Sequence, residues 1–431
     1  MTVINTQYHE HIHSTGDFNP NKYFVFENED QRAWWQHTAP LLARVFRSAR
    51  YPVEQQYLYM TLYKTLIVPL LGPHPNTWDS FISYSGIPIE FSTNYQENGP
   101  PTCRIGWEPV SHLSGTSSDR LNLETVSKAI SLLAGLNLKS FDRRLFDRFM
   151  KTLVLSSDEA ATVKTEELSW ARLKNQLSLG LDLKDGDVTV KCYVYPALKS
   201  MITGRPFREL LDQALGIGED GSFSHCADAL HSVHDYLEQA GLYNQYSFLG
   251  FDFVEPSKSR LKVYNTTQDV TWPKIEGIWT LGGKFAENPT IKRGLDAAQE
   301  LWRLLTGETD RMAVGIYNYE LAPGNPVPMT KWYFILNGQN DLANAQAIIA
   351  FYQHLGWHDL ADLFVPNFRS YLYVTLVLFI LNTIDRTDTI DSPDSDLNET
   401  DNLLQYVSLA YSEKTGVYFS VYYHSSVNFG N

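Results

Sequence analysis

Basic and phenolic side chains recur at two-residue spacing in several short stretches of the chain. Residues 191–195 read Lys-Cys-Tyr-Val-Tyr, and residues 260–264 read Arg-Leu-Lys-Val-Tyr. Alternate residues of a β-strand share one face, so each stretch would present its bases and phenols together. The residues selected in this way are Arg104 and Gly106, Lys191, Tyr193 and Tyr195, Arg260, Lys262 and Tyr264, Lys331 and Tyr333, and Tyr418 and Tyr422.

Such a set of side chains suits a ligand with one anionic and one cationic end. Arginine and lysine bind phosphate oxygens through charge-assisted hydrogen bonds. Tyrosine rings attract a cation to their faces and can add hydroxyl donors. A diphosphate ester whose carbon skeleton becomes a carbocation would match both properties. The candidate diphosphate-binding bases are Arg104, Lys191, Arg260, Lys262 and Lys331.

Hairpins are the elements that would position these residues. After residue 80 the apolar pattern changes from a helical to a two-residue period, and strand-like stretches flank turn signals such as ENGPP and KDGD. The expected strand pairs are 81–94 with 102–110, 176–183 with 188–195, 246–254 with 260–267, 312–320 with 329–337, and 403–411 with 416–424.

Segments with helical apolar spacing separate the hairpins, and the order helix, helix, strand, strand recurs about five times. About ten antiparallel strands in sequence order lose all their edges only by closing on themselves. The pattern therefore predicts one domain over residues 1–431, an α/β (α+β) barrel with a polar lumen and helices outside. A helical solenoid, and hairpins with a solvated polar face, are the alternatives. The expected helices are 30–49, 53–71, 122–136, 206–215, 227–240, 291–305, 342–354 and 367–381.

The bulk composition argues against several classes of partner. The 431 residues carry a net charge of −14, which disfavours a nucleic-acid or anionic-membrane surface. The N-terminal stretch lacks an apolar signal region, no apolar run is long enough to span a bilayer, and three cysteines fit a reducing compartment. We therefore expect a cytoplasmic protein that binds small molecules. The sequence leaves a monomer and a homodimer both open.

Motifs for other kinds of site are absent from the sequence. There is no GxxxxGK[ST] loop, no GxGxxG after a strand and no HExxH. The acidic stretch 385–401 lacks the paired aspartates on a helix face that would hold a magnesium diphosphate, so it favours a solvated loop. We expect no metal and no cofactor, with the diphosphate ester acting as a co-substrate.

Longer motifs are spread over nearly the whole chain. They are WWQHTAPLLARVF, QQYLYMTLYKTLIVPLLGPHP, GIPIEFSTNYQ, CRIGWEPVS, KCYVYPALKS, SRLKVYNTT, KWYF and VYFSVYYH. In these motifs the chain resembles the fungal indole prenyltransferases of the dimethylallyltryptophan synthase family. The resemblance implies a prenyltransferase (ABBA) barrel of ten antiparallel strands built from five ααββ units. It also implies metal-independent transfer of a dimethylallyl group from dimethylallyl diphosphate to an indole ring, by electrophilic aromatic substitution.

The resemblance further implies roles for individual residues. Glu90 would accept a hydrogen bond from the indole N–H, where positive charge grows as the ring attacks the carbocation. Without the resemblance, a carboxylate at this position could equally pair with a base of the lumen. The bases implied for the diphosphate are Arg104, Lys191, Arg260 and Lys262, with Lys331 where Lys or Gln is expected. The tyrosines implied as a shield around the diphosphate and the allylic cation are Tyr193, Tyr264, Tyr333, Tyr418 and Tyr422.

Two departures from the family pattern favour a large, uncharged acceptor. Gly106 shares a face with Arg104, and a residue without a side chain leaves room for a bulky ligand. Residues 244–251 (NQYSFLGF) offer no base for the carboxylate of free tryptophan. We expect a tryptophan-containing cyclic dipeptide, or a related indole alkaloid, next to Glu90, Gly106 and Tyr195. A phenolic or tyrosine acceptor, and a non-catalytic barrel that binds an isoprenoid diphosphate, are the alternatives.

Overall fold

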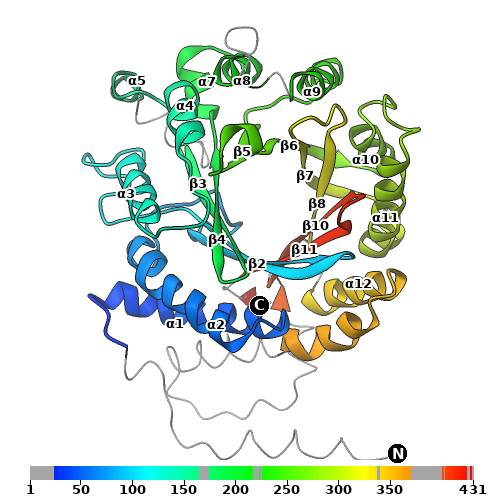
Figure 1. The fold of residues 1–431 in the computed structure, drawn as a ribbon, viewed down its shortest axis with the longest axis horizontal. Helices are drawn as coiled ribbons and strands as arrows, with labels where there is room; N and C mark the ends of the chain where they lie inside the picture. Colours follow the sequence, from blue (N-terminus) through cyan, green and yellow to red (C-terminus); the bar gives the residue numbers. More distant parts are fainter. Residues whose placement is uncertain are drawn as a thin grey trace, which may run out of the picture.

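The computed structural model describes residues 24–164, 174–216, 223, 226–336, 340–369, 400–401, 403–424 and 428–429. Within this part of the chain, ten strands form one closed antiparallel barrel in the order β1-β11-β10-β8-β7-β6-β5-β4-β3-β2. The strands form an inner ring and the helices an outer ring (Figure 1). The predicted closed barrel is confirmed, and the solenoid alternative is wrong.

Hairpins supply all the strands of the barrel, and each second strand pairs with the first strand of the next hairpin. All the hairpin turns therefore lie at one end of the barrel, which we call the turn end. Glu90 lies toward the opposite end of the barrel, which we call the far end. The strands are β1 (Ile89–Gln96), β2 (Gly99–Trp107), β3 (Leu177–Lys184), β4 (Asp187–Val194), β5 (Phe248–Asp252), β6 (Leu261–Val270), β7 (Met312–Leu321), β8 (Met329–Ile335), β10 (Leu404–Ser412) and β11 (Gly416–Tyr423). β9 (Thr400–Asp401) and β12 (Asn428–Phe429) form a separate pair.

The helices of the outer ring begin at favourable polar caps in several places. The side chain of Asn28 accepts the backbone N–H of Gln31 at the start of the first helix, where Glu29 and Asp30 also suit the helix dipole. The helices are α1 (Glu29–Ser48), α2 (Val53–Leu62), α3 (Leu123–Ala134), α4 (Arg144–Leu153), α5 (Ser157–Thr162), α7 (Ala197–Thr203), α8 (Phe207–Leu215), α9 (Ala227–Gln239), α10 (Trp272–Trp279), α11 (Pro289–Thr306) and α12 (Asp341–His354). Among the described residues, none of the helices combines the length and the apolar character needed to cross a bilayer.

Alternation along each strand separates the core from the lumen. On β4, Val190, Cys192 and Val194 are buried in the hydrophobic core, whereas Lys191 and Tyr193 line the interior cavity. The core therefore lies between the outer faces of the strands and the helices, as the two-residue pattern of the sequence predicts.

Three details differ from the sequence-based expectation. The strand expected over 81–94 begins only at Ile89, because Pro88 lacks the N–H that a ladder needs, and residues 81–88 form a loop. The helix expected over 53–71 is α-helical only to Leu62 and continues as a π-helical turn (Tyr63–Ile67) and a 3-10 helix (Val68–Leu70). The helices α4, α5, α7 and α10 were not expected from the sequence. The acidic stretch up to residue 399 lies outside the described residues. Of the helix expected over 367–381, residues 370–381 also lie outside them, and 367–369 belong to a helical stretch that begins at residue 358.

Candidate active site

The register of the barrel arranges the lumen side chains in layers. Lys191 on β4 lies opposite Asp252 on β5, and Tyr193, one step farther from the turn end, lies opposite Gly250. The same order along the other hairpins gives a charged layer near the turns and a tyrosine layer above it. Beyond the tyrosines, toward the far end, lies Glu90.

These layers enclose one cavity of about 860 Å³. The structure brings together at its wall every site residue selected from the sequence. They are Glu90, Arg104, Gly106, Lys191, Tyr193, Tyr195, Arg260, Lys262, Tyr264, Lys331, Tyr333, Tyr418 and Tyr422.

Carboxylates from the first strands of the hairpins pair with the bases of the charged layer. Asp182 on β3 lies between two of them, with Oδ1 2.9 Å from Arg104 Nε and Oδ2 2.5 Å from Lys191 Nζ. Although burial opposes it, the positive charges of Lys191 and Arg104 hold the pKa of Asp182 well below its ordinary value. Burial lowers the pKa of Lys191 to about 8, and Asp182 opposes that shift. Asp182 therefore helps to keep Lys191 charged.

The next hairpins repeat the arrangement around Glu320 on β7. Arg260 Nη2 lies 2.9 Å from Asp252 Oδ2, and its Nη1 lies 3.4 Å from Glu320 Oε1. Lys262 Nζ lies 3.4 Å from the other oxygen of Glu320. Burial alone would raise the pKa of Glu320, but Lys262 and Arg260 lower it to about 2. The charged layer thus alternates bases and ionised carboxylates around the barrel, with the bases in excess.

Lys331 differs from the other bases of this layer. Its ammonium lies 5.2 Å from the ring centroid of Tyr333 and 4.9 Å from that of Tyr418, and no salt bridge joins it to a carboxylate of the described residues. Burial lowers its pKa well below the ordinary value, and nearby Arg104 and Lys262 lower it further. A bound diphosphate would give Lys331 the counter-charge that it lacks here.

The tyrosine layer is continuous around much of the lumen. Ring centroids are 5.9 Å apart between Tyr193 and Tyr264, 6.2 Å between Tyr264 and Tyr333, and 6.0 Å between Tyr333 and Tyr422. Tyr406 on β10 extends it, with its ring 4.2 Å from that of Tyr422. Such a wall of π faces stabilises a cation without supplying a nucleophile that would capture it, because burial raises the pKa of these phenols.

At the far end, Glu90 is 6% exposed and its Oε2 accepts a hydrogen bond from the hydroxyl of Tyr406. Burial raises the pKa of Glu90 to about 8, and the Tyr406 hydrogen bond opposes this shift. Glu90 makes no salt bridge to a base within the described part of the chain. The structure therefore does not show the alternative arrangement, in which Glu90 pairs with a base of the lumen.

The loop before β1 covers the wall beside Glu90. A Cβ at Gly106 would lie 3.3 Å from Ile82 Cγ1 and 3.5 Å from Glu90 Oε1, so Ile82 occupies part of the space that the glycine leaves. Phe81 packs against Tyr195, with ring centroids 5.0 Å apart. Both loop residues line the cavity.

Several residues of the cavity were not selected from the sequence. The carboxylates Asp182 and Glu320 could have been found from the two-residue spacing of the sequence. This spacing puts Asp182 on the same strand face as Gly180, and Glu320 on the same strand face as Asn318. Both carboxylates lie on first strands of hairpins, whereas most of the predicted site residues lie on second strands. Tyr406 has no such partner pattern, and the loop residues were placed in a strand. The lining residues that were not predicted from the sequence include Phe81, Ile82, Asp182, Phe248, Glu320 and Tyr406.

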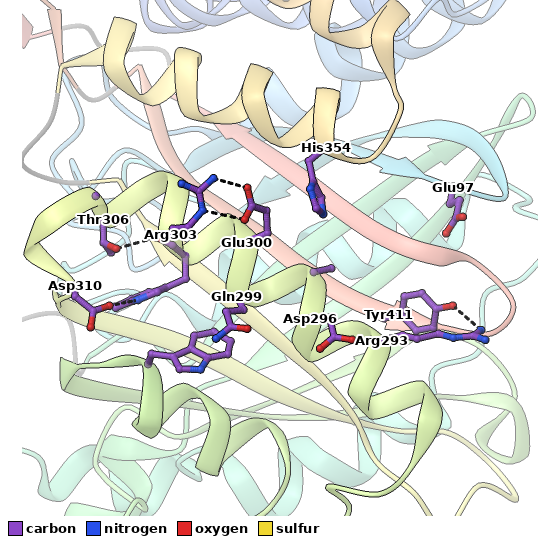
Figure 2. Close-up of a pocket in the computed structure, with 14 residues that line it drawn as sticks. Glu97, Arg293, Asp296, Gln299, Glu300, Arg303, Thr306, Asp310, His354 and Tyr411 are labelled. Atoms are coloured by element: carbon purple, nitrogen blue, oxygen red, sulfur yellow. Dashed lines mark hydrogen bonds and ion pairs between the residues drawn. The ribbon is translucent and has the colours of Figure 1, made fainter.

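A second cavity, of about 940 Å³, lies outside the barrel beside α11 (Figure 2). Both arginines that line it already have partners among the lining residues. Arg303 Nη2 lies 2.6 Å from Glu300 Oε1, and Arg293 donates to the Tyr411 hydroxyl at 3.3 Å. No set of bases converges there, so the lumen is the better candidate for an anionic substrate.

Comparison with known proteins identifies the family. A family model for tryptophan dimethylallyltransferase matches residues 30–367. The chain belongs to this family. Prenyltransferase phqJ of Penicillium fellutanum is 44% identical to it over 353 residues, which cover 82% of this chain and 86% of phqJ. Prenyltransferase malE of Malbranchea aurantiaca is 39% identical over 426 residues, which cover 95% of this chain and 91% of malE. This member of the tryptophan dimethylallyltransferase family is therefore an aromatic prenyltransferase.

Solved structures share the fold of this tryptophan dimethylallyltransferase family member. The crystal structure of NotF in complex with brevianamide F and DMSPP matches 94% of this chain and 97% of its own, with a TM-score of 0.82 and 35% identity. AnaPT from Neosartorya fischeri matches with a TM-score of 0.77 and 28% identity. The barrel is thus the expected prenyltransferase (ABBA) barrel.

Proposed function

We propose that this prenyltransferase transfers the dimethylallyl group of dimethylallyl diphosphate to the indole ring of a tryptophan-containing cyclic dipeptide, without a metal ion. The observation that carries the proposal is the order of layers in one cavity: bases near the turns, tyrosines above them and the buried carboxylate of Glu90 at the far end. The NotF complex supports it, because that related barrel is solved in complex with brevianamide F and DMSPP.

Donor ionisation is the first step of the proposed reaction. The bases of the charged layer would bind the diphosphate oxygens, so that the C–O bond breaks and its electron pair leaves with the diphosphate. The dimethylallyl cation that remains would lie against Tyr193, Tyr264, Tyr333 and Tyr422. Tyr418, hydrogen-bonded to Arg104 and close to Lys331, would lie at the boundary between the diphosphate and the cation.

Ring attack is the second step. A carbon of the indole gives its electron pair to the cation and forms the new C–C bond, which leaves the ring positively charged. Glu90 in its carboxylate form would accept the indole N–H and stabilise this charge, which is present only after attack begins. Transfer of the ring proton to the released diphosphate would restore aromaticity, and the protonated inorganic diphosphate would then leave.

The lining of the far end supports an acceptor without a net charge. Around Glu90 the described lining residues are Phe81, Ile82, Tyr195, Phe248 and Tyr406, none of which is a base. A free amino acid would leave its carboxylate unpaired among these side chains, at a considerable desolvation cost. A cyclic dipeptide has no such carboxylate.

The test is an incubation of the purified protein with dimethylallyl diphosphate and a panel of acceptors. The panel contains tryptophan-containing cyclic dipeptides, free tryptophan, a tricyclic indole alkaloid, tyrosine and a simple phenol, and products are analysed by mass spectrometry and NMR. We expect one added prenyl unit on the indole of cyclic dipeptides. Preferential prenylation of the phenols would favour the phenolic alternative, and tight donor binding without diphosphate release would favour the non-catalytic barrel.

A further inference from the structure

Glu108 is a buried carboxylate that directly follows β2 and does not line the cavity. Four side-chain donors surround it. Oε1 accepts from Trp78 Nε1 at 2.7 Å and from Asn122 Nδ2 at 3.3 Å, and Oε2 accepts from Ser80 Oγ at 2.5 Å and from Asn175 Nδ2 at 2.7 Å. All its partners are therefore neutral hydrogen-bond donors, and its bonds fill both oxygens.

Two of these donors belong to the segment 78–87, which runs from Trp78 to Ile87 before β1. Ser80 Oγ also accepts the backbone N–H of Ile82 at 3.2 Å, so one hydroxyl links Glu108 to the backbone that carries Ile82. Asn175 extends the connection, because its Nδ2 also lies 3.3 Å from the carbonyl oxygen of Asp79. Glu108 thus holds this segment at several points.

Two residues of the segment 78–87, Phe81 and Ile82, line the cavity where the acceptor is proposed to bind. Ile82 lies over Gly106 next to Glu90, and Phe81 packs against Tyr195. The backbone of the segment makes no strand pairing with the barrel, so its position depends on side-chain anchors. Glu108 supplies two of these anchors, through Trp78 and Ser80.

We propose that Glu108 is a positioning residue for the acceptor: by fixing the segment 78–87 it sets where the indole lies relative to the allylic cation, although it touches neither substrate. The inference rests on the proposed function, and it makes Glu108 one of the residues that determine which atom of the ring is alkylated. The competing explanation is that Glu108 only stabilises the fold. In that case its loss would lower stability without changing how the acceptor is held.

The variant Glu108→Gln separates these explanations. Glutamine keeps the size but puts an NH₂ group in place of one carboxylate oxygen, so either Trp78 and Asn122 or Ser80 and Asn175 lose their acceptor. We expect the KM for the cyclic dipeptide to rise about tenfold and the product to become a mixture of positional isomers, since small misplacements of a substrate change which atom reacts. The Kd for inorganic diphosphate, measured by calorimetry, should stay within about twofold, since the charged layer is untouched.

Asp119→Asn is the matched control. Asp119 is also buried and accepts three hydrogen bonds, from Glu124 N, Thr125 N and Thr125 Oγ1, but these partners lie at the start of α3. A comparable fall in Tm is expected from both variants. Only Glu108→Gln should change the KM for the acceptor and the isomer ratio, and equal changes in both variants would overturn the inference.

A second measurement does not depend on turnover. Hydrogen exchange of the amides of Ser80, Ile82 and Gly86 should accelerate in Glu108→Gln and not in Asp119→Asn, because local anchoring controls local opening. Ser80→Ala, which removes a single link, should do the same to a smaller extent and serves if the first variant does not fold. Unchanged exchange in these amides would refute the positioning role, whether or not the wild-type protein forms a product. Absence of product from the wild-type protein would by itself refute only the proposed function.

Discussion

Single residues at the far end of the lumen carry the most specific chemistry. Glu90 is buried, accepts a hydrogen bond from Tyr406 and forms no salt bridge with a base of the described residues, so its charge depends on pH around a pKa of about 8. A group with a raised pKa is protonated below that value. The proposed role needs the carboxylate, so kcat/KM for the acceptor should fall as pH decreases below about 8, and a pH profile of initial rates measures this.

Replacing Glu90 with glutamine tests the same role by removing the charge. We expect kcat to fall by roughly two to four decades, the range associated with losing one preorganised transition-state interaction, and the pH dependence below 8 to disappear. Affinity for dimethylallyl diphosphate should hardly change, because its bases lie on other strands. Normal turnover, or an equal loss of donor affinity, would make Glu90 a structural residue.

Gly106 is the second residue with a sharp expectation. Threonine at this position would need space that Ile82 and the Glu90 carboxylate already occupy, at 3.3 and 3.5 Å from the new Cβ. We expect Gly106→Thr to abolish transfer or to redirect the attacked atom, while diphosphate binding persists. Product analysis by NMR decides the matter, and an unchanged rate and product would mean that the acceptor does not approach this part of β2.

At the level of elements, the hairpins and the faces of their second strands could be predicted from the sequence, because alternation is a local property. Lys191 with Tyr193 and Lys262 with Tyr264 were placed on the lumen face in this way. The carboxylate partner of Lys191 was not, because the pairing of Asp182 with it depends on the register between two strands. The conformation of the segment 78–87 could not be predicted either, since it depends on contacts with Glu108 and Asn175 rather than on its own pattern.

Close packing between neighbouring strands gives a prediction for β5. A Cβ at Gly250 would lie 3.1 Å from Tyr264 Cε2 and 3.2 Å from Tyr193 Cδ1, so Gly250→Ala should push both rings out of the tyrosine layer. We expect kcat to fall about 10- to 100-fold with little change in diphosphate affinity. Gly277→Ala on α10 is the control, because its nearest neighbour, the Tyr236 hydroxyl, lies at an ordinary 3.5 Å. Equal rates in the two variants would contradict the shielding role.

For the whole molecule, the distribution of charge predicts how the reaction responds to metal removal. The chain has a net charge of −14, yet bases outnumber carboxylates in the charged layer that would bind the diphosphate. Turnover should therefore survive EDTA, with a moderate stimulation by magnesium if the ion helps inorganic diphosphate to leave. Assays in EDTA and after adding back magnesium check this. Complete loss restored by magnesium would refute the metal-free mechanism.

The barrel closes where β1 pairs with β11, so the first and last strands of its wall are more than 300 residues apart in the chain, as in the pair Ser92 and Tyr422. A ribosome must finish the last hairpin before this seam can form. Until then, the edges of β1 and β10 are both unpaired, and Tyr418 and Tyr422 are missing from the lumen. Folding into an active state is thus expected to follow synthesis rather than to accompany it, and to be slow because its decisive contacts are so distant in sequence.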